Sequence, residues 1–219
     1  GSRQRLATFD DPELCVTVNN ASVKQVKSAK TLGMTLDENL TWRDHVEVIS
    51  KKISSGIGAL KRIRGLIDQE TAIKVYQGFI EPYFSYCAPV WDGLGHTLSD
   101  RLQKLQNRAA RVITRSSYDI SSNLLLDQLK WNNLSVNRLK QKAILMYKTL
   151  NGQTPQYLHE MFTSRRCQYP LRNSNGKLFI PKPNTDYLKR SFSYSGAILW
   201  NNLPESLRLS PSFTAFRSS

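Results

Sequence analysis

The chain has 219 residues, 40% of them hydrophobic, and carries 31 lysines and arginines against 17 aspartates and glutamates. This length allows one large domain or two small ones with a buried core. Its apolar runs fall short of the about 20 residues that cross a bilayer, so no membrane partner is expected. Three cysteines without a CxxC pair argue against a zinc knuckle or a disulfide framework and favour an intracellular protein.

The positive charge is concentrated in the later parts of the chain. Basic and acidic residues number five and five in residues 1–40, twelve and seven in 41–115, and fourteen and five in 116–219. An anionic partner, most simply nucleic acid, is therefore expected for the second and third segments. The alternative is a basic domain without such a partner.

A β-hairpin is predicted near the N-terminus. Residues 14–18 alternate in the manner of a strand, residues 19–22 are rich in turn formers, and residues 23–36 can return as one or two strands. Gly33 interrupts this run, where a bulge or the close approach of another backbone would require it.

Two amphipathic helices are predicted next. Thr41 is expected to cap the first and Gly65 to end it, while Asp68 caps the second and Pro82 ends it. Apolar residues recur in both at spacings of three and four. The expected buried stripes are Trp42, Val46, Ile49, Ile53, Ile57 and Leu60 in the first helix, and Ala72, Val75, Tyr76, Phe79 and Ile80 in the second. The aromatic segment 83–91 is interpreted as core, with a base-stacking platform as the alternative.

Residues 98–115 predict a helix with one apolar and one basic face. The apolar set is Leu98, Leu102, Leu105, Ala109 and Val112. The basic set is Arg101, Lys104, Arg108, Arg111 and Arg115. Helical geometry places the two sets about 120° apart. The basic face is interpreted either as a contact for phosphates or as an ordinary solvated face.

The remaining chain is predicted to be helical and rich in loops. Residues 116–123 form a polar link, and a helix from Ser135 to Leu150 is expected to bury Val136, Leu139, Ala143, Met146 and Leu150. Residues 164–190 are basic and interrupted by prolines, which favours extended or loop structure. Phe192, Ala197, Ile198 and Trp200 of a last helix are expected to dock on the preceding helices. The predicted fold class is mainly α.

No pattern of catalytic residues is found. The acidic pairs are explained by turns and helix starts, three scattered histidines do not suggest a metal site, and no phosphate-binding glycine loop or nucleophile motif occurs. The residues thus predict binding without chemistry, with no catalytic residue, metal ligand or cofactor in this chain.

The order of several stretches resembles the reverse transcriptases of LINE-type non-LTR retrotransposons, nearest to the jockey, CR1 and L2 clades. These stretches are KTLGMTLDENLTWRDHVEVISKKI, VYQGFIEPYFSYCAPVWDG and LQKLQNRAARVIT, followed by LLLDQLKWNNLSVNR, MYKTLNGQTPQYL and FSYSGAILWNNLP. The resemblance covers nearly the whole chain and concerns the region that follows the palm. It implies residues 1–40 as the end of the palm, 41–116 as the thumb and 117–219 as a C-terminal basic helical segment.

The resemblance also implies functional roles. Leu32, Gly33 and Met34 would belong to the primer grip. The polymerase aspartates and their Mg²⁺ would lie upstream of residue 1, so this chain is expected not to polymerise alone. The implied partners are an RNA template, an RNA–DNA or DNA duplex, and the palm, fingers and endonuclease of the parent polypeptide. A nuclear or cytoplasmic ribonucleoprotein is the implied setting.

Thirteen basic residues are the candidates for contact with nucleic acid. They are Lys51, Lys52, Lys61, Arg62, Arg101, Lys104, Arg108, Arg111, Arg115, Arg165, Arg166, Lys189 and Arg190. One alternative function is a helical protein-interaction scaffold, or a domesticated remnant, with exposed apolar area around the first hairpin and Trp42. An enzyme in its own right is the third hypothesis.

Overall fold

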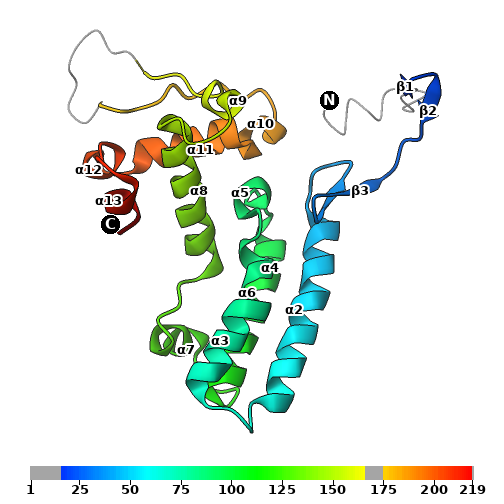
Figure 1. Cartoon of the computed structure of the whole chain (residues 1–219), viewed down its shortest axis with the longest axis vertical. Helices are drawn as coiled ribbons and strands as arrows, with labels where there is room; N and C mark the ends of the chain where they lie inside the picture. The colour runs from blue at the N-terminus through cyan, green and yellow to red at the C-terminus, as the bar shows by residue number, and fades with distance from the viewer. Residues whose placement is uncertain (1–15, 166–174, 219) are drawn as a thin grey trace. The chain divides into compact units, whose positions relative to one another are not determined.

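The computed structural model describes residues 16–165 and 175–218, which are mainly α-helical (Figure 1). This confirms the predicted fold class. Contacts divide the described chain into two compact units, with the boundary between Val48 and Ile49. The division into palm end, thumb and C-terminal segment stays a prediction. None of the described helices is both long and apolar enough to cross a membrane.

The first unit contains two antiparallel hairpins instead of the one that was predicted. Strand β1 (Val16–Val18) pairs with β2 (Ala21–Val23), and β3 (Ser28–Thr31) pairs with β4 (Met34–Asp37). The second hairpin forms because Leu32 and Gly33 both have positive φ angles, 48° and 81°, which suits a two-residue hairpin turn. Gly33 therefore serves a turn and not a bulge.

Helix α2 (Arg43–Ile63) begins after a turn that Asp37 organises. The Asp37 carboxylate accepts hydrogen bonds from the backbone N–H groups of Asn39, Thr41 and Trp42 at 3.2, 3.0 and 2.8 Å and from the Thr41 hydroxyl at 3.1 Å. Thr41 is the predicted cap, and its hydroxyl oxygen accepts a long hydrogen bond, 3.4 Å, from the backbone N–H of Arg43. Asp37 takes the larger role because its carboxylate reaches several free donors at once.

The helices that follow α2 belong to the second unit. They are α3 (Gln69–Phe79), α4 (Pro82–Ser85), α5 (Ala88–Trp91), α6 (His96–Thr114), α7 (Ser122–Gln128), α8 (Leu134–Leu150), α9 (Gln156–His159), α10 (Asp186–Arg190), α11 (Phe192–Asn202), α12 (Glu205–Arg208) and α13 (Phe213–Ser218). Helix α6 contacts α3, α7 and α8, and α8 also contacts α5, α11 and α13 (Figure 1). The two long helices α6 and α8 thus organise the packing.

The predicted buried face of α2 is confirmed, and the core interpretation of the aromatic segment is confirmed in part. Trp42, just before α2, and the five predicted apolar residues within α2 are buried, as are Phe84 and Trp91, whereas Tyr86 is 53% exposed. In α3 the buried row is Ala72, Tyr76 and Ile80, whereas Phe79 is 74% exposed and that part of the prediction is wrong. Phe79 is the last residue of α3 and lies one position, about 100° around the helix, from the buried row of Ala72, Tyr76 and Ile80.

The buried face of α6 is rotated from the predicted one. Its buried residues are Leu102, Gln106, Ala109, Ala110 and Ile113. Leu98, Leu105 and Val112 are only partly buried. Gln106 can be buried because its amide donates to the Asn132 carbonyl at 3.1 Å and accepts from Gln103 at 2.8 Å. The rotation moves the basic residues to about 160° from the centre of the buried row, which leaves them on the opposite side of the helix.

The predicted stripe of α8 is wrong in its first half. Val136 and Leu139 are 38% and 46% exposed, whereas Arg138 and Lys142 are buried. The two cations occupy the packed face because Asp92, which follows α5, forms ion pairs with both of them. A buried cation tolerates such a position when a carboxylate compensates its charge.

The C-terminal helices pack on the second half of α8, as predicted for Ala197 and Trp200. These two residues share a core with Met146, Tyr147 and Phe216, and Phe192 packs against it. A Cβ atom at Gly196 would lie 2.6 Å from the Met146 sulfur, so a larger residue there would displace the Met146 side chain from the contact between α11 and α8. This core anchors the end of the chain to the same helix that carries the buried cations.

Candidate nucleic-acid interface

A concave, positively charged surface lies between the end of α2 and the second half of α6, and we call it the basic groove. Its volume is about 500 Å³. Five cations and one aromatic residue dominate its lining: Lys61, Arg64, Arg108, Arg111, Arg115 and Tyr118. Among the residues that the structure describes, no aspartate or glutamate lines the groove. The groove is therefore shaped and charged for an anion.

Arg64 connects the two walls of the groove. Its side chain is 8% exposed, and its Nε and Nη1 atoms donate to the carbonyl oxygens of Ile113 and Ile67 at 2.8 and 2.7 Å. The carbonyl oxygen of Arg64 in turn accepts a hydrogen bond from Nη2 of Arg115 at 2.6 Å. These bonds tie the residues that follow α2 to the last turn of α6.

Arg111 is held by the link between α6 and α7. Its Nη2 donates to the Ile120 carbonyl at 3.2 Å and to the Ser122 hydroxyl at 3.0 Å. The guanidinium also lies over the Tyr118 ring, with 4.9 Å between its carbon and the ring centroid. The partners of Arg111 are thus neutral groups that orient the guanidinium without cancelling its charge.

The groove keeps its positive charge. Within residues 16–165 and 175–218, none of its five cations forms an ion pair. Lys61 and Arg108 are exposed on its two walls. Arg64 interacts weakly with Asp68, whose pKa is lowered mainly by hydrogen bonds from Thr71, with small contributions from Lys74 and Arg64. A solvent-accessible cluster of cations without carboxylate partners attracts polyanions.

The groove brings together four of the thirteen predicted residues: Lys61, Arg108, Arg111 and Arg115. Arg101 and Lys104 are exposed on the same side of α6, nearer its beginning. Lys51, Lys52 and Arg62 are exposed on α2 outside the lining, and the Lys52 ammonium lies 5.5 Å from the Tyr83 ring centroid. Arg101 and Lys104 therefore continue the basic side of α6 beyond the groove, whereas Lys52, nine positions before Lys61, lies on the opposite side of α2.

The C-terminal candidates lie in other surroundings. Arg165 is exposed and its backbone N–H binds the Lys177 carbonyl at 2.9 Å. Lys189 forms an ion pair with Asp186 at 3.1 Å, and the Arg190 guanidinium lies 5.1 Å from the Tyr187 ring centroid. Arg166 lies outside the described residues. The three described residues, Arg165, Lys189 and Arg190, are not among the residues that line the groove. The role of all four stays a prediction.

Two groove residues were not among the predicted set. Arg64 directly precedes Gly65, the predicted end of the first helix. The sequence shows that Arg64 is charged, but it does not predict the contact of Arg64 with α6. Tyr118 is 89% exposed in the polar link. Its signal in the sequence is an aromatic residue that directly follows a basic helix and stands among serines.

The predicted primer-grip residues form the end of the second hairpin. Leu32 and Gly33 make its turn, Leu32 is 84% exposed, and Met34 is buried. Their assigned role stays a prediction.

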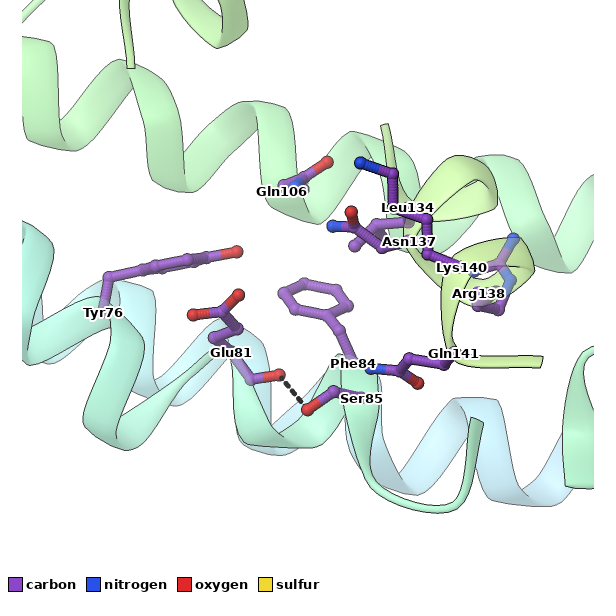
Figure 2. Close-up of a pocket in the computed structure, with 10 residues that line it drawn as sticks. All are labelled: Tyr76, Glu81, Phe84, Ser85, Gln106, Leu134, Asn137, Arg138, Lys140 and Gln141. Atoms are coloured by element: carbon purple, nitrogen blue, oxygen red, sulfur yellow. Dashed lines mark hydrogen bonds between the residues drawn. The ribbon is translucent and has the colours of Figure 1, made fainter. Parts of the chain in front are cut away.

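A second pocket, between α3, α4 and α8, has mixed chemistry (Figure 2). Its volume is about 230 Å³. Figure 2 shows the Tyr76 hydroxyl, the Glu81 carboxyl and the Phe84 ring turned toward the same space, with Arg138 on the opposite side. Burial raises the pKa of Glu81, and burial together with the nearby Glu81 charge raises that of Tyr76. This pocket carries both signs of charge and is a weaker candidate for phosphates.

Histidine, cysteine and carboxylate side chains do not gather into a metal-binding cluster of three or more in the described part of the chain.

Comparison with known proteins confirms the predicted resemblance. No family model matches the chain, and no solved structure matches it. The chain is 26% identical over 118 residues to the "Probable RNA-directed DNA polymerase from transposon X-element" of Drosophila melanogaster, which is 52% of this chain and 13% of that protein. It is 26% identical over 126 residues to the corresponding protein from transposon BS of the same organism, which is 55% of this chain and 14% of that protein.

A third similar protein is the "Retrovirus-related Pol polyprotein from type-1 retrotransposable element R1" of Nasonia vitripennis. The identity is 23% over 129 residues, which is 57% of this chain and 38% of that polyprotein. The matched segments thus cover about half of this chain and a minor part of the relatives. All these relatives are retrotransposon polymerases or Pol polyproteins.

Proposed function

We propose that this chain, a relative of non-LTR retrotransposon reverse transcriptases, holds nucleic acid in the basic groove as part of an RNA-directed DNA polymerase. The ligand is an RNA template or an RNA–DNA or DNA duplex, bound through its phosphates. The observation that carries this proposal is the gathering of five cations from α2, α6 and the residues that follow them on one concave surface, where no carboxylate occurs among the described lining residues.

The chemistry of the groove favours backbone contacts. Arginine presents a planar set of donors that matches phosphate oxygens, and three of the five cations reach the groove from one side of α6. Contacts of this kind fix the position of a strand without reading its sequence. A polymerase that copies a whole RNA needs this tolerance of sequence.

The parent activity is part of the same proposal. Polymerase aspartates and their Mg²⁺ would reside in a palm outside this chain, which would work together with fingers and an endonuclease of the same polypeptide. The small share of each relative that this chain matches supports such a larger assembly. The setting would be a nuclear or cytoplasmic ribonucleoprotein.

Salt-dependent binding of an RNA–DNA hybrid tests the proposal. If Lys61, Arg108, Arg111 and Arg115 each neutralise one phosphate, affinity should fall about 150-fold between 50 and 200 mM salt. The double variant Lys61→Ala with Arg108→Ala should leave only about a 12-fold fall, because two phosphate contacts remain. Fluorescence anisotropy with a labelled 16-base-pair hybrid measures both.

The matched control is Lys74→Ala, which removes an exposed lysine of α3 that is paired with Glu70 at 2.7 Å. Its salt dependence should equal that of the wild type. Absence of binding by the wild type, or an equal effect of the control and the groove variants, would contradict the proposal.

A protein-interaction scaffold is a second candidate function. Val16, Val18 and Val23 of the first hairpin are each about half exposed, which favours it, whereas Trp42 is buried, which removes the second expected surface. Binding of an apolar fluorescent dye to the full chain, and its loss in a Val16→Thr, Val18→Thr variant, would support this candidate. Unchanged dye fluorescence in that variant would count against it.

A further inference from the structure

Tyr118 presents a largely exposed aromatic ring at the basic groove. The residue is 89% exposed and follows α6 in the link to α7. An aromatic side chain normally gains free energy from burial, so a ring this exposed contributes little to the fold. It nevertheless lines the same surface as the five cations.

One face of the Tyr118 ring is engaged by a fixed cation. The Arg111 guanidinium lies 4.9 Å from the ring centroid, and that guanidinium is itself oriented by Ile120 and Ser122. The ring is thus positioned by Arg111, while its high exposure leaves a large part of it to solvent. A flat ring backed by a guanidinium is a suitable surface for stacking a further planar group.

The charge of the groove indicates which planar ligand would stack on the Tyr118 ring. Lys61, Arg108 and Arg115 line the surface next to the ring, so a ligand that combines phosphates with flat rings satisfies both features. Nucleotides have this combination, and stacking of a base on an aromatic side chain contributes about 1–3 kcal/mol. Inside a continuous duplex each base is already stacked on its neighbours. The ring can therefore reach an unpaired base but not an internal base pair.

We propose that Tyr118 stacks on an unpaired nucleobase of a strand whose phosphates lie on Lys61, Arg108 and Arg115. This inference rests on the proposed function and assigns its ligand more narrowly. The basic groove then binds single-stranded or frayed nucleic acid more tightly than blunt duplex of the same length. Phe84 and Trp91, from the aromatic segment considered as a stacking platform, are buried and cannot take this role.

The test compares a labelled 12-nucleotide single-stranded RNA with its blunt 12-base-pair RNA–DNA hybrid by fluorescence anisotropy at 50 mM salt. Tyr118→Ala should weaken binding of the single strand about 5- to 150-fold, which corresponds to the loss of one stacked base. It should change binding of the hybrid less than about twofold, since the phosphate contacts remain. Tyr118→Phe keeps the ring and should bind the single strand like the wild type.

Tyr157→Ala is the matched control, because Tyr157 of α9 is also well exposed and is not part of the groove lining. It should leave both affinities unchanged, and circular dichroism should show that all variants fold. If the wild type binds neither ligand, the proposed function itself fails. If the wild type binds both with the expected salt dependence but Tyr118→Ala weakens neither, or both equally, only the stacking site is overturned.

Discussion

The basic groove and the ion cluster around Asp92 use the same kinds of residue for opposite purposes. In the cluster, Arg138 and Lys142 of α8 are buried and paired with one carboxylate, and Arg138 also donates to the Ser99 hydroxyl at 2.6 Å. In the groove, Arg64, Arg111 and Arg115 bind backbone carbonyl oxygens. In the cluster the positive charges are neutralised by a carboxylate inside the protein, whereas in the groove they are not neutralised and can bind an anionic ligand.

The difference lies in the partner and not in the cation. A carboxylate orients a guanidinium and also neutralises it, while a carbonyl orients it and leaves the net charge in place. Net positive charge in a sequence therefore overstates what is available for binding. The four predictions that follow test this distinction, from the largest expected effect to the smallest.

Replacing Asp92 should destabilise the protein most. In Asp92→Asn two buried cations lose their only ion-pair partner in the described chain, and the free energy of unfolding should fall by about 3–5 kcal/mol. Urea unfolding measures this. The affinity of the folded protein for an RNA–DNA hybrid should not change, because Asp92 is not in the groove. Asp100→Asn, which affects an exposed pair with His96, should cost less than about 0.5 kcal/mol.

Arg64 should affect both stability and binding. Arg64→Met leaves the carbonyls of Ile113 and Ile67 without their donor, which should lower the free energy of unfolding by about 2 kcal/mol. Hybrid affinity should also fall, since the two walls of the groove lose their connection. Arg62→Met, on the exposed side of α2, serves as the control for the unfolding assay, and Lys74→Ala on α3 serves as the control for binding. An unchanged urea midpoint for Arg64→Met would contradict the structural role of Arg64.

Asp37 shows the same effect for an acidic residue: neutral N–H and O–H groups orient its carboxylate and do not cancel its charge. Burial alone would raise its pKa, but hydrogen bonds from Thr41, Trp42 and Asn39 outweigh burial and lower it below 3.8. Its stabilising contribution is therefore present above pH 3.8 and is lost as the pH falls through the lowered pKa of the folded state. Asp37→Asn should cost about 1 kcal/mol at pH 7 and little in strong acid, as measured by urea unfolding at several pH values. Glu38→Gln, at an exposed neighbouring carboxylate, is the control and should change the free energy of unfolding by less than about 0.5 kcal/mol.

Glu81 provides the opposite case and the smallest effect. It shares a pocket with Arg138, yet Arg138 is paired with Asp92, and burial raises the pKa of Glu81. A raised pKa means that the folded state binds the proton more tightly, so this contribution to stability is complete below pH 4.5 and is lost as the pH rises through the folded pKa. Glu81→Gln should remove this loss. The variant should gain stability relative to the wild type as the pH increases from 4 to 7, and a constant difference would argue against the raised pKa.

Local patterns predicted much of the fold and part of the site. The buried face of α2 follows from apolar residues spaced by three and four, and the basic side of α6 follows from the same periodicity. The face of α8 could not be predicted in this way, because the burial of Arg138 and Lys142 depends on Asp92, which lies about fifty positions earlier in the chain. The turn at Asp37 was missed for a different reason: its carboxylate binds several N–H groups within five residues, and apolar periodicity carries no signal for such a turn.

By itself, the sequence determined the helical class, the uneven positive charge and the likeness to retrotransposon polymerases, because composition, periodicity and motif order are properties of the chain alone. Only the tertiary structure decided which cations stay available. Because α2 and the α6–α7 link pack against α6, Lys61 lines the same groove as Arg108 and Arg111. For the same reason the Arg111 guanidinium lies over the Tyr118 ring. The physical reason is that the charge left for a ligand depends on the partner that each side chain finds in space, and that partner is often distant in sequence.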